Sequence, residues 1–142
     1  MIRRKTPSVF ALITNSPRLL ITDDDRHVRE TLGAIFKPRG FQTLLASDGE
    51  EALDIVQNEQ VHVVLIDMHM PRMTGLEMIR QVKLTHAAMP CILISGALDE
   101  HLAEEARRAQ VFSQLAKPIS LLDVTSIVGA AMRQTYDWPP AA

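Results

Sequence analysis

Cysteine is almost absent from this chain of 142 residues, because Cys91 is the single one. An intramolecular disulfide is therefore excluded, and no Cys/His spacing matches a zinc site. Long apolar runs are missing as well, since none approaches the roughly 18 residues that a membrane span needs. The net charge is only −2 with a pI near 6.2, which gives no support for nucleic-acid or membrane binding by the whole domain. We predict a cytoplasmic protein with no direct nucleic-acid partner and no membrane partner.

What the sequence does contain is an alternation of short apolar runs with helical periodicities. With 46% hydrophobic residues, a chain of this length can bury one core and is most simply one domain. The expected strands are residues 19–21, 41–46, 61–66, 91–94 and 111–116. The expected helices follow them, near residues 28–36, 47–56, 74–85, 99–109 and 121–131. Strands and helices that alternate through short loops predict an α/β fold with a doubly wound, five-stranded parallel sheet of order 2-1-3-4-5.

Both ends of the chain lie outside this pattern. Residues 1–17 are expected to form an N-terminal extension that closes with an Asn-Ser-Pro turn signal. The folded domain is expected to span 18–134. Residues 135–142 are expected to form a C-terminal tail, since Pro139-Pro140 cannot continue a helix.

Capping and breaking residues locate two of the helix boundaries. Lys37-Pro38-Arg39-Gly40 ends the first helix. Ser47, with Glu50 three residues later, predicts a capping box at the start of the second helix.

The carboxyl ends of the predicted strands carry the side chains of chemical interest. These are Asp67 after the third strand, Asp23 and Asp24 after the first, Ser95 after the fourth and Lys117 after the fifth. In a parallel sheet all these ends lie on one edge, which is where open α/β sheets place their ligand sites. The five side chains are therefore expected to converge on one pocket.

Three carboxylates in one pocket repel one another, since two unit charges ~4 Å apart cost about 4 kcal/mol at an effective dielectric near 20. A hard divalent cation removes that cost, and Mg²⁺ accepts carboxylates, waters and phosphate oxygens as ligands. A cation, a carboxylate, a hydroxyl and a lysine together predict a site for a phosphoryl group. We expect Asp67 to be the nucleophile, while the metal and Lys117 hold the transferring oxygens.

Four separated motifs resemble the receiver domain of two-component response regulators, in its single-domain, chemotaxis-regulator-like form. The motifs are Leu19-Leu20-Ile21-Thr22-Asp23-Asp24-Asp25, Asp67-Met68-His69-Met70-Pro71-Arg72-Met73-Thr74-Gly75-Leu76-Glu77, Ile94-Ser95-Gly96 and Lys117-Pro118. The likeness covers about residues 18–134, with the motifs in the family's order and spacing. It implies a flavodoxin-like (βα)5 fold and identifies residues 18–134 as the receiver domain.

The resemblance implies that a histidine kinase or a histidine phosphotransfer protein donates a phosphoryl group to Asp67, which becomes an aspartyl phosphate. Ser95 would then hydrogen-bond the phosphoryl group, Lys117 would pair with it, and Pro118 would follow a cis peptide bond. The domain would catalyse only its own phosphorylation and dephosphorylation and would otherwise not be an enzyme. The output would be a change in the face around the fourth helix and fifth strand, where an unknown downstream protein binds.

The resemblance also implies Mg²⁺ as the cofactor. Asp24, Asp67 and the backbone carbonyl of His69 would ligate the metal directly. Asp23 would hold it through water.

The sequence departs from the family's pattern in two places. Gln114 stands where the family usually has an aromatic residue, whose ring moves inward when the hydroxyl at the position of Ser95 turns toward the phosphate. Gln110 and Val111 replace the usual Gly-Ala, so the fourth helix lacks its glycine stop. Ser95 and Gln114 are thus the expected switch residues, and we hypothesise that this chain signals through an atypical surface or switch.

Two other functions remain open from the sequence. A degenerate receiver could serve only as a protein-binding scaffold, although all five pocket residues are present. An Asp-dependent phosphohydrolase of the haloacid-dehalogenase type also uses a nucleophilic aspartate and Mg²⁺. It is disfavoured, because the second acid expected two residues after the nucleophile is His69 here.

Overall fold

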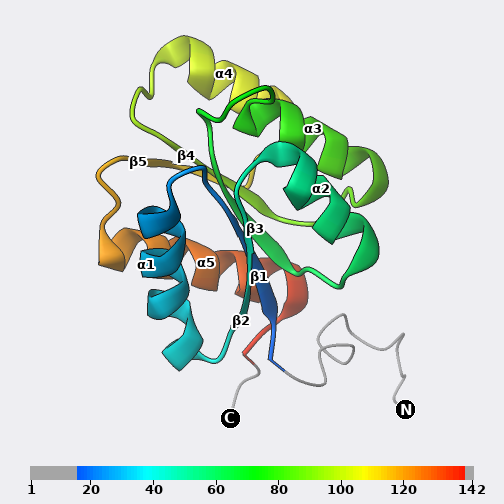
Figure 1. Ribbon diagram of the computed structural model, residues 1–142, viewed down its shortest axis with the longest axis vertical. Helices are drawn as coiled ribbons and strands as arrows, with labels where there is room; N and C mark the ends of the chain where they lie inside the picture. Colours follow the sequence, from blue (N-terminus) through cyan, green and yellow to red (C-terminus); the bar gives the residue numbers. More distant parts are fainter. Residues whose placement is uncertain (1–15, 140–142) are drawn as a thin grey trace.

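A computed structural model describes residues 16–139, and in this range five parallel strands alternate with five α-helices (Figure 1). The strands are β1 (Arg18–Thr22), β2 (Gln42–Ala46), β3 (Val63–Asp67), β4 (Cys91–Ser95) and β5 (Ser113–Ala116). The helices are α1 (Arg26–Phe36), the short 3-10 helix η2 (Lys37–Arg39), α2 (Gly49–Asn58), α3 (Gly75–Thr85), α4 (Glu100–Arg108) and α5 (Leu121–Tyr136). The sheet order is β2-β1-β3-β4-β5, which confirms the predicted doubly wound fold. None of the helices in the described range is long and apolar enough to cross a membrane.

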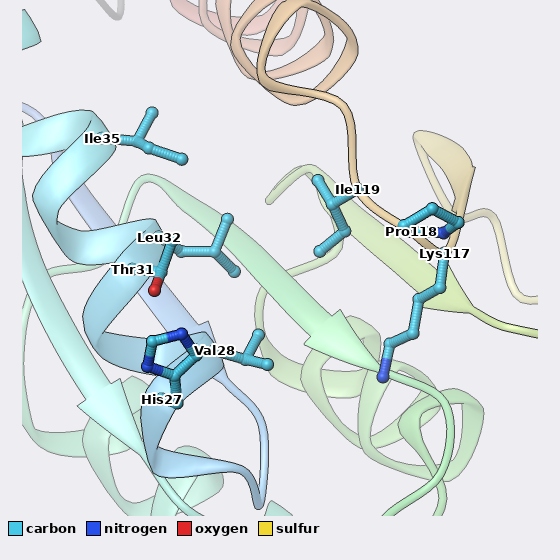
Figure 2. Close-up of a pocket in the computed structure, with 8 residues that line it drawn as sticks. All are labelled: His27, Val28, Thr31, Leu32, Ile35, Lys117, Pro118 and Ile119. Carbon is cyan, nitrogen blue, oxygen red and sulfur yellow. The ribbon is translucent and has the colours of Figure 1, made fainter.

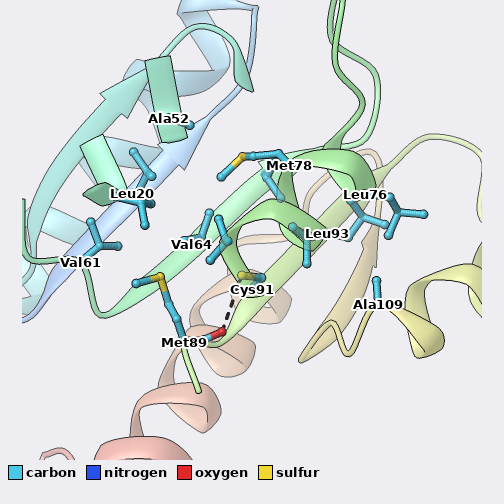
Figure 3. Close-up of a cluster of buried hydrophobic side chains, with 14 of the residues drawn as sticks. Leu20, Ala52, Val61, Val64, Leu76, Met78, Met89, Cys91, Leu93 and Ala109 are labelled. Atoms are coloured by element: carbon cyan, nitrogen blue, oxygen red, sulfur yellow. Dashed lines mark hydrogen bonds between the residues drawn. The ribbon is translucent and has the colours of Figure 1, made fainter. Parts of the chain in front are cut away.

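Two apolar layers hold the helices to the sheet, because successive strand residues point to opposite faces. Leu20, Val64 and Leu93 contribute to the layer beneath α2, α3 and α4 (Figure 3). Leu19 and Val63 contribute to the layer on the opposite face, which α1 and α5 cover (Figure 1). Such double-sided burial explains why the central strands read as continuous apolar runs rather than as alternating ones.

Every strand differs from its predicted bounds, by one residue at most in β1, β2 and β4 and by two residues at the start of β3 and of β5. The third strand begins at Val63 rather than Val61 and includes Asp67 as its last residue. The fifth begins at Ser113 rather than Val111, because the Val111 N–H donates to Ala106 O at 3.1 Å and so belongs to the end of α4. The apolar character of Val61 and Val111 reflects packing against the core rather than pairing in the sheet.

The predicted capping box at Ser47 and Glu50 is wrong by one residue. Asp48 is the N-cap of α2, and its Oδ1 accepts from the Glu51 N–H at 2.8 Å. Ser47 instead donates its backbone N–H to Glu51 Oε1 at 2.7 Å. The N-cap bond is therefore present one position later than predicted, but the reciprocal bond of a capping box is not formed, because the Glu51 side chain accepts from Ser47 and not from the N-cap residue.

Tyr136 and Trp138 pack on the domain, although residues 135–142 were predicted to be a tail, of which residues 140–142 lie outside the described range. Helix α5 runs to Tyr136, whose hydroxyl donates to His62 O at 2.6 Å. The Trp138 ring lies edge-on to Phe41, with ring centroids 5.5 Å apart. At the other end the predicted extension, residues 1–17, lies outside the described residues except for its last two.

Candidate functional site

Asp67 occupies the carboxyl end of β3, in the middle of the sheet, and its side chain is almost fully buried at 2% exposure. The chain turns tightly behind it, since the Gly75 N–H donates to Met68 O at 2.9 Å. A Cβ on Gly75 would lie 2.6 Å from Asp67 O, so only glycine leaves room for this turn. The loop and the first turn of α3 therefore fix the backbone that carries the carboxylate.

Asp23 and Asp24 follow β1, the strand that neighbours β3. Asp23 is buried, and its Oδ1 accepts from the Asp25 N–H at 2.8 Å. Asp25 in turn caps α1, because its side chain accepts hydrogen bonds from the backbone N–H groups of His27 and Val28. Arg29, from the first turn of α1, donates to Asp23 O at 2.7 Å. This loop is thus held in shape by its own hydrogen bonds while Asp24 stays exposed.

The three carboxylates meet as predicted. Asp23, Asp24 and Asp67 each present one oxygen within 4.8 Å of the others. Lys117 Nζ lies 3.0 Å from Asp67 Oδ1 and forms an ion pair with it. That contact does not have the direction of a good hydrogen bond, and Asp67 Oδ1 has no hydrogen-bond donor among residues 16–139.

Ser95 and Lys117 come from the two strands on the other side of β3. Ser95 ends β4 and is fully buried, and its Oγ accepts from the Ala97 N–H at 3.1 Å. The Lys117 N–H donates to Ser95 O at 3.0 Å, which ties the two strand ends together. The Lys117-Pro118 peptide bond is cis, as the resemblance implied. Four strand ends thus deliver the predicted side chains to one edge of the sheet.

Burial and charge shift two pKa values in this pocket. Burial raises the pKa of Asp23 above its ordinary value, and the negative charges of Asp67 and Asp24 raise it further. Burial alone would lower the pKa of Lys117, but the close contact with Asp67 and the negative charge of that carboxylate raise it, and the net shift is upward. Lys117 is therefore a permanent ammonium, whereas the ionised carboxylates are only partly compensated.

The donor set fits a hard divalent cation. Carboxylate oxygens are the ligands that Mg²⁺ prefers. The buried Asp67 Oδ1, with one cationic neighbour and no hydrogen-bond donor in the described chain, has a free lone pair for a metal. Asp23 and Asp24 present their oxygens to the same point.

Two other predicted residues do not add a side chain to this cluster. The His69 side chain is exposed. The predicted metal ligand at this position is the backbone carbonyl of His69, not its imidazole. Gln114 is half-buried in β5 and pairs in register with Leu93, on the face that α4 covers. Sequence reasoning missed Arg29, because a side chain that reaches a backbone carbonyl six residues away leaves no spacing pattern.

A shallow apolar recess of about 480 Å³ lies beside the pocket, between α1 and the residues after β5. Its lining residues are His27, Val28, Thr31, Leu32, Ile35, Lys117, Pro118 and Ile119. Figure 2 shows Val28, Leu32 and Ile119 facing one another, with the Lys117 ammonium beside the tip of β3. The rim of the pocket thus offers an apolar surface next to the acidic cluster.

Comparison with known proteins gives one consistent result. Residues 19–129 match the profile of the response regulator receiver domain. The response regulator MprA of Mycobacterium sp. (strain KMS) is 35% identical over 120 residues, which cover 83% of this chain and 51% of that protein. The chain therefore spans about half the length of this relative.

Solved structures show the same fold. A CheY-like response regulator receiver domain protein from Methanospirillum hungatei JF-1 superposes with a TM-score of 0.82 at 21% identity, covering 85% of this chain and 97% of that one. Response regulator protein TrrA from Thermotoga maritima, crystallised in complex with Mg²⁺-BeF, gives a TM-score of 0.74 at 23% identity. That match covers 81% of this chain and 98% of TrrA. At sequence identities of 21% and 23%, these two structural similarities are evidence for the fold alone.

Proposed function

This chain belongs to the response regulator receiver domain family, and from this premise we propose that Asp67 accepts a phosphoryl group from a histidine kinase or a histidine phosphotransfer protein. Receiver domains of this family serve in signalling and interact with histidine kinases. The observation that carries the proposal is the buried Asp67 carboxylate, which lies within 4.8 Å of two further carboxylates and 3.0 Å from the Lys117 ammonium. The apolar recess beside Lys117 offers a surface to which the phosphoryl-donor protein can bind while its phosphohistidine reaches the pocket.

Mg²⁺ would be held directly by Asp24, Asp67 and the backbone carbonyl of His69, and through water by Asp23. It would supply positive charge that offsets the carboxylates and the phosphoryl oxygens. The binding of Mg²⁺-BeF by TrrA is in line with this assignment. The buried, donor-free Asp67 Oδ1 supports it from this chain's own geometry.

The transfer itself needs few groups. An oxygen of Asp67 attacks phosphorus while the P–N bond to the donor imidazole breaks, and the electron pair of that bond stays on the imidazole nitrogen. Lys117 is placed to pair with a phosphoryl oxygen, because its ammonium already lies against Asp67. Ser95 can exchange the Ala97 N–H for the phosphoryl group by rotating its hydroxyl, which then donates to a phosphoryl oxygen. Attack of water on the aspartyl phosphate returns the starting state.

Output through an atypical switch is part of the proposal. Gln114 is polar and half-buried beneath α4, so it lacks the apolar ring that would be driven inward by a movement of Ser95. We expect a bound phosphate analogue to shift Ser95 without an inward rotation of Gln114. Amide and side-chain NMR spectra with and without Mg²⁺-BeF would test this, and a coupled shift of Gln114 and α4 would count against it.

Mass spectrometry after treatment with acetyl phosphate and Mg²⁺ tests the phosphoacceptor. The wild-type chain should gain the mass of one phosphoryl group, and Asp67→Asn should gain none. Asp54→Asn is the matched control, since Asp54 is an exposed carboxylate on α2 and its loss should leave labelling unchanged. An equal gain in wild type and Asp67→Asn would place the phosphoryl group elsewhere.

Two further outcomes would favour the other functions. No labelling of a folded wild-type chain would favour a protein-binding scaffold. Turnover of a small phosphate ester would favour a phosphohydrolase, although the position two residues after Asp67 carries an exposed imidazole instead of an acid.

A further inference from the structure

An ion pair ties the loop between β3 and α3 to the start of α2. Arg72 Nη2 lies 2.9 Å from Asp48 Oδ2, and the Asp48 side chain is only 24% exposed. Its other oxygen, Oδ1, accepts from the Glu51 N–H as the cap of α2. Both oxygens of Asp48 are therefore used, one for the helix and one for the loop.

A close contact reinforces this tie one residue further on. A Cβ on Gly49 would lie 2.7 Å from Met73 Sδ and 3.2 Å from Met73 Cβ. Glycine as the first residue of α2 thus lets the Met73 side chain lie this close, and a larger residue would have to displace that side chain. Arg72 and Met73 together press the loop onto the helix that Asp48 caps.

The backbone at Arg72 forms a tight turn of a strained kind, in which the Met73 N–H donates to Pro71 O at 2.8 Å and Arg72 is the central residue. Its φ of 69° lies in the left-handed region, which is unfavourable for a residue with a side chain. Such a conformation persists where surrounding contacts impose it. Besides the hydrogen bond of the turn itself, the contacts present here are the Arg72–Asp48 ion pair and the packing of Met73 on Gly49.

The loop held in this way is the one that carries the proposed metal-binding carbonyl. His69 lies three residues before Arg72, and the hydrogen bond from Gly75 N–H to Met68 O closes the loop around both. We propose that Arg72 is a positioning residue for Mg²⁺, which acts through Asp48 by holding the loop so that the His69 carbonyl faces the carboxylates. This inference rests on the proposed function, because it takes the metal site as given.

Charge and position make opposite predictions for Arg72→Ala. Removing a nearby cation lowers the repulsion of Mg²⁺, so a charge effect alone would strengthen metal binding. Loss of positioning would weaken it. We expect the affinity for Mg²⁺ to fall about threefold, since a mostly exposed ion pair contributes little.

Isothermal titration of the metal-free full chain with Mg²⁺ gives the test. Arg72→Ala and Asp48→Asn should each bind about threefold more weakly than wild type, and the double variant should be no weaker than either, because both remove the same contact. Asp48→Asn keeps an acceptor for the Glu51 N–H, so α2 keeps its cap. Arg72→Lys should recover part of the affinity.

Arg108→Ala is the matched control, because Arg108 pairs with Glu104 on α4 and does not touch the loop. Its Mg²⁺ affinity should equal that of wild type. Melting temperatures of the metal-free proteins show whether each variant is folded, and Arg72→Gly, which relaxes the backbone, tests the ion pair even if Arg72→Ala unfolds.

The two proposals fail in different ways. If wild type binds Mg²⁺ and the Arg72 variants bind it equally well or more tightly, the positioning role is wrong and the phosphoacceptor proposal is untouched. If wild type itself does not bind Mg²⁺, the proposed function falls and the inference falls with it.

Discussion

Burial of Asp23 beside two other carboxylates makes its ionised form unfavourable, which raises its pKa. A carboxyl whose folded pKa is raised stabilises the fold fully below its unfolded pKa, and that contribution is lost as the pH rises through the folded value. In the metal-free protein, the stabilising contribution of Asp23 therefore decreases as the pH rises. The clustered carboxylates thus lower the folding stability of the metal-free protein, and they are the same groups that can bind a cation.

Asp23→Asn should consequently stabilise the metal-free protein at pH 7.5, raising its melting temperature by about 3 °C. Its amide oxygen can still accept from the Asp25 N–H, so the loop is preserved. The difference from wild type should shrink as the pH is lowered from 7.5 to 4.5, because a carboxyl with a raised pKa takes up its proton earlier in the folded protein than in the unfolded chain. Thermal unfolding in EDTA at both pH values measures this, and a variant that is less stable at pH 7.5 would contradict it.

Lys117 is expected to weaken the binding of Mg²⁺, whereas the three carboxylates strengthen it. Its ammonium compensates Asp67 in the metal-free pocket but repels a metal that binds there. We expect Lys117→Gln to bind Mg²⁺ about two- to fivefold more tightly, while it is labelled more slowly by acetyl phosphate. Lys37→Gln, an exposed lysine after α1, should behave like wild type in both measurements. Weaker Mg²⁺ binding by Lys117→Gln would mean that Lys117 chiefly orders the pocket.

The end of α4 shows how an element can keep its geometry without its usual residue. Gln110 N–H donates to Arg107 O at 3.0 Å and Val111 N–H to Ala106 O at 3.1 Å, which is the Schellman arrangement. Gln110 has a φ of 61°, the left-handed value that glycine adopts at this position. The missing glycine seen in the sequence therefore costs stability instead of changing the helix end.

Gln110→Gly should accordingly raise the free energy of unfolding by about 1 kcal/mol, because it removes the strain of a side chain at positive φ. Urea denaturation of the two proteins measures the gain. Gln81→Gly, which replaces an exposed glutamine inside α3, is the opposite control and should lose about 1 kcal/mol. If Gln110→Gly also lowered the free energy of unfolding, the Gln110 side chain would make a contact that stabilises the fold by more than its positive φ destabilises it.

The tight turn after β3 allows a second test at the scale of elements. A Cβ on Gly75 would clash with Asp67 O at 2.6 Å and with Leu93 Cδ1 at 2.9 Å. Gly75→Ala should therefore destabilise the fold by about 1–3 kcal/mol and slow labelling of Asp67. Gly96→Ala is the matched control, since nothing lies within 4 Å of its added Cβ. Equal stability of the two variants would show that the turn relaxes freely.

The sequence predicted the elements better than their ends. Strand order followed from five apolar runs alternating with helices, and the convergence of Asp23, Asp67 and Lys117 followed because parallel strands end on one edge. The N-cap of α2 was misplaced because Ser47 and Asp48 are both good caps, and only the folded backbone chooses between them. The roles assigned to the site residues stay predictions.

At the scale of the molecule, side chains that join distant segments were not predictable. Arg72 reaches Asp48 across 24 positions and Tyr136 reaches His62 across 74, and neither contact leaves a local pattern. We predicted that the domain ends at residue 134, because Pro139-Pro140 cannot continue a helix. Helix α5 continues to Tyr136, because Tyr136 and Trp138 pack against the core. Tertiary contacts thus set the extent of the domain.

A chain cut after residue 134 tests that extent. It loses the hydrogen bond from the Tyr136 hydroxyl to His62 O and the packing of Trp138 on Phe41, both in the described range. We expect the free energy of unfolding to fall by about 3 kcal/mol, close to the cost of removing one packed aromatic side chain. A chain cut after residue 139 keeps these contacts and should be as stable as the full chain.

Affinity for Mg²⁺ separates this loss from the chemistry of the pocket. His62 precedes β3 and Asp67 ends it, so the aromatic contacts and the carboxylates lie at opposite edges of the sheet. The chain cut after 134 should therefore bind Mg²⁺ like the full chain under conditions where it is folded. If urea unfolding gave equal stability for the two cut chains, residues 135–139 would be a true tail and the boundary at 134 would stand.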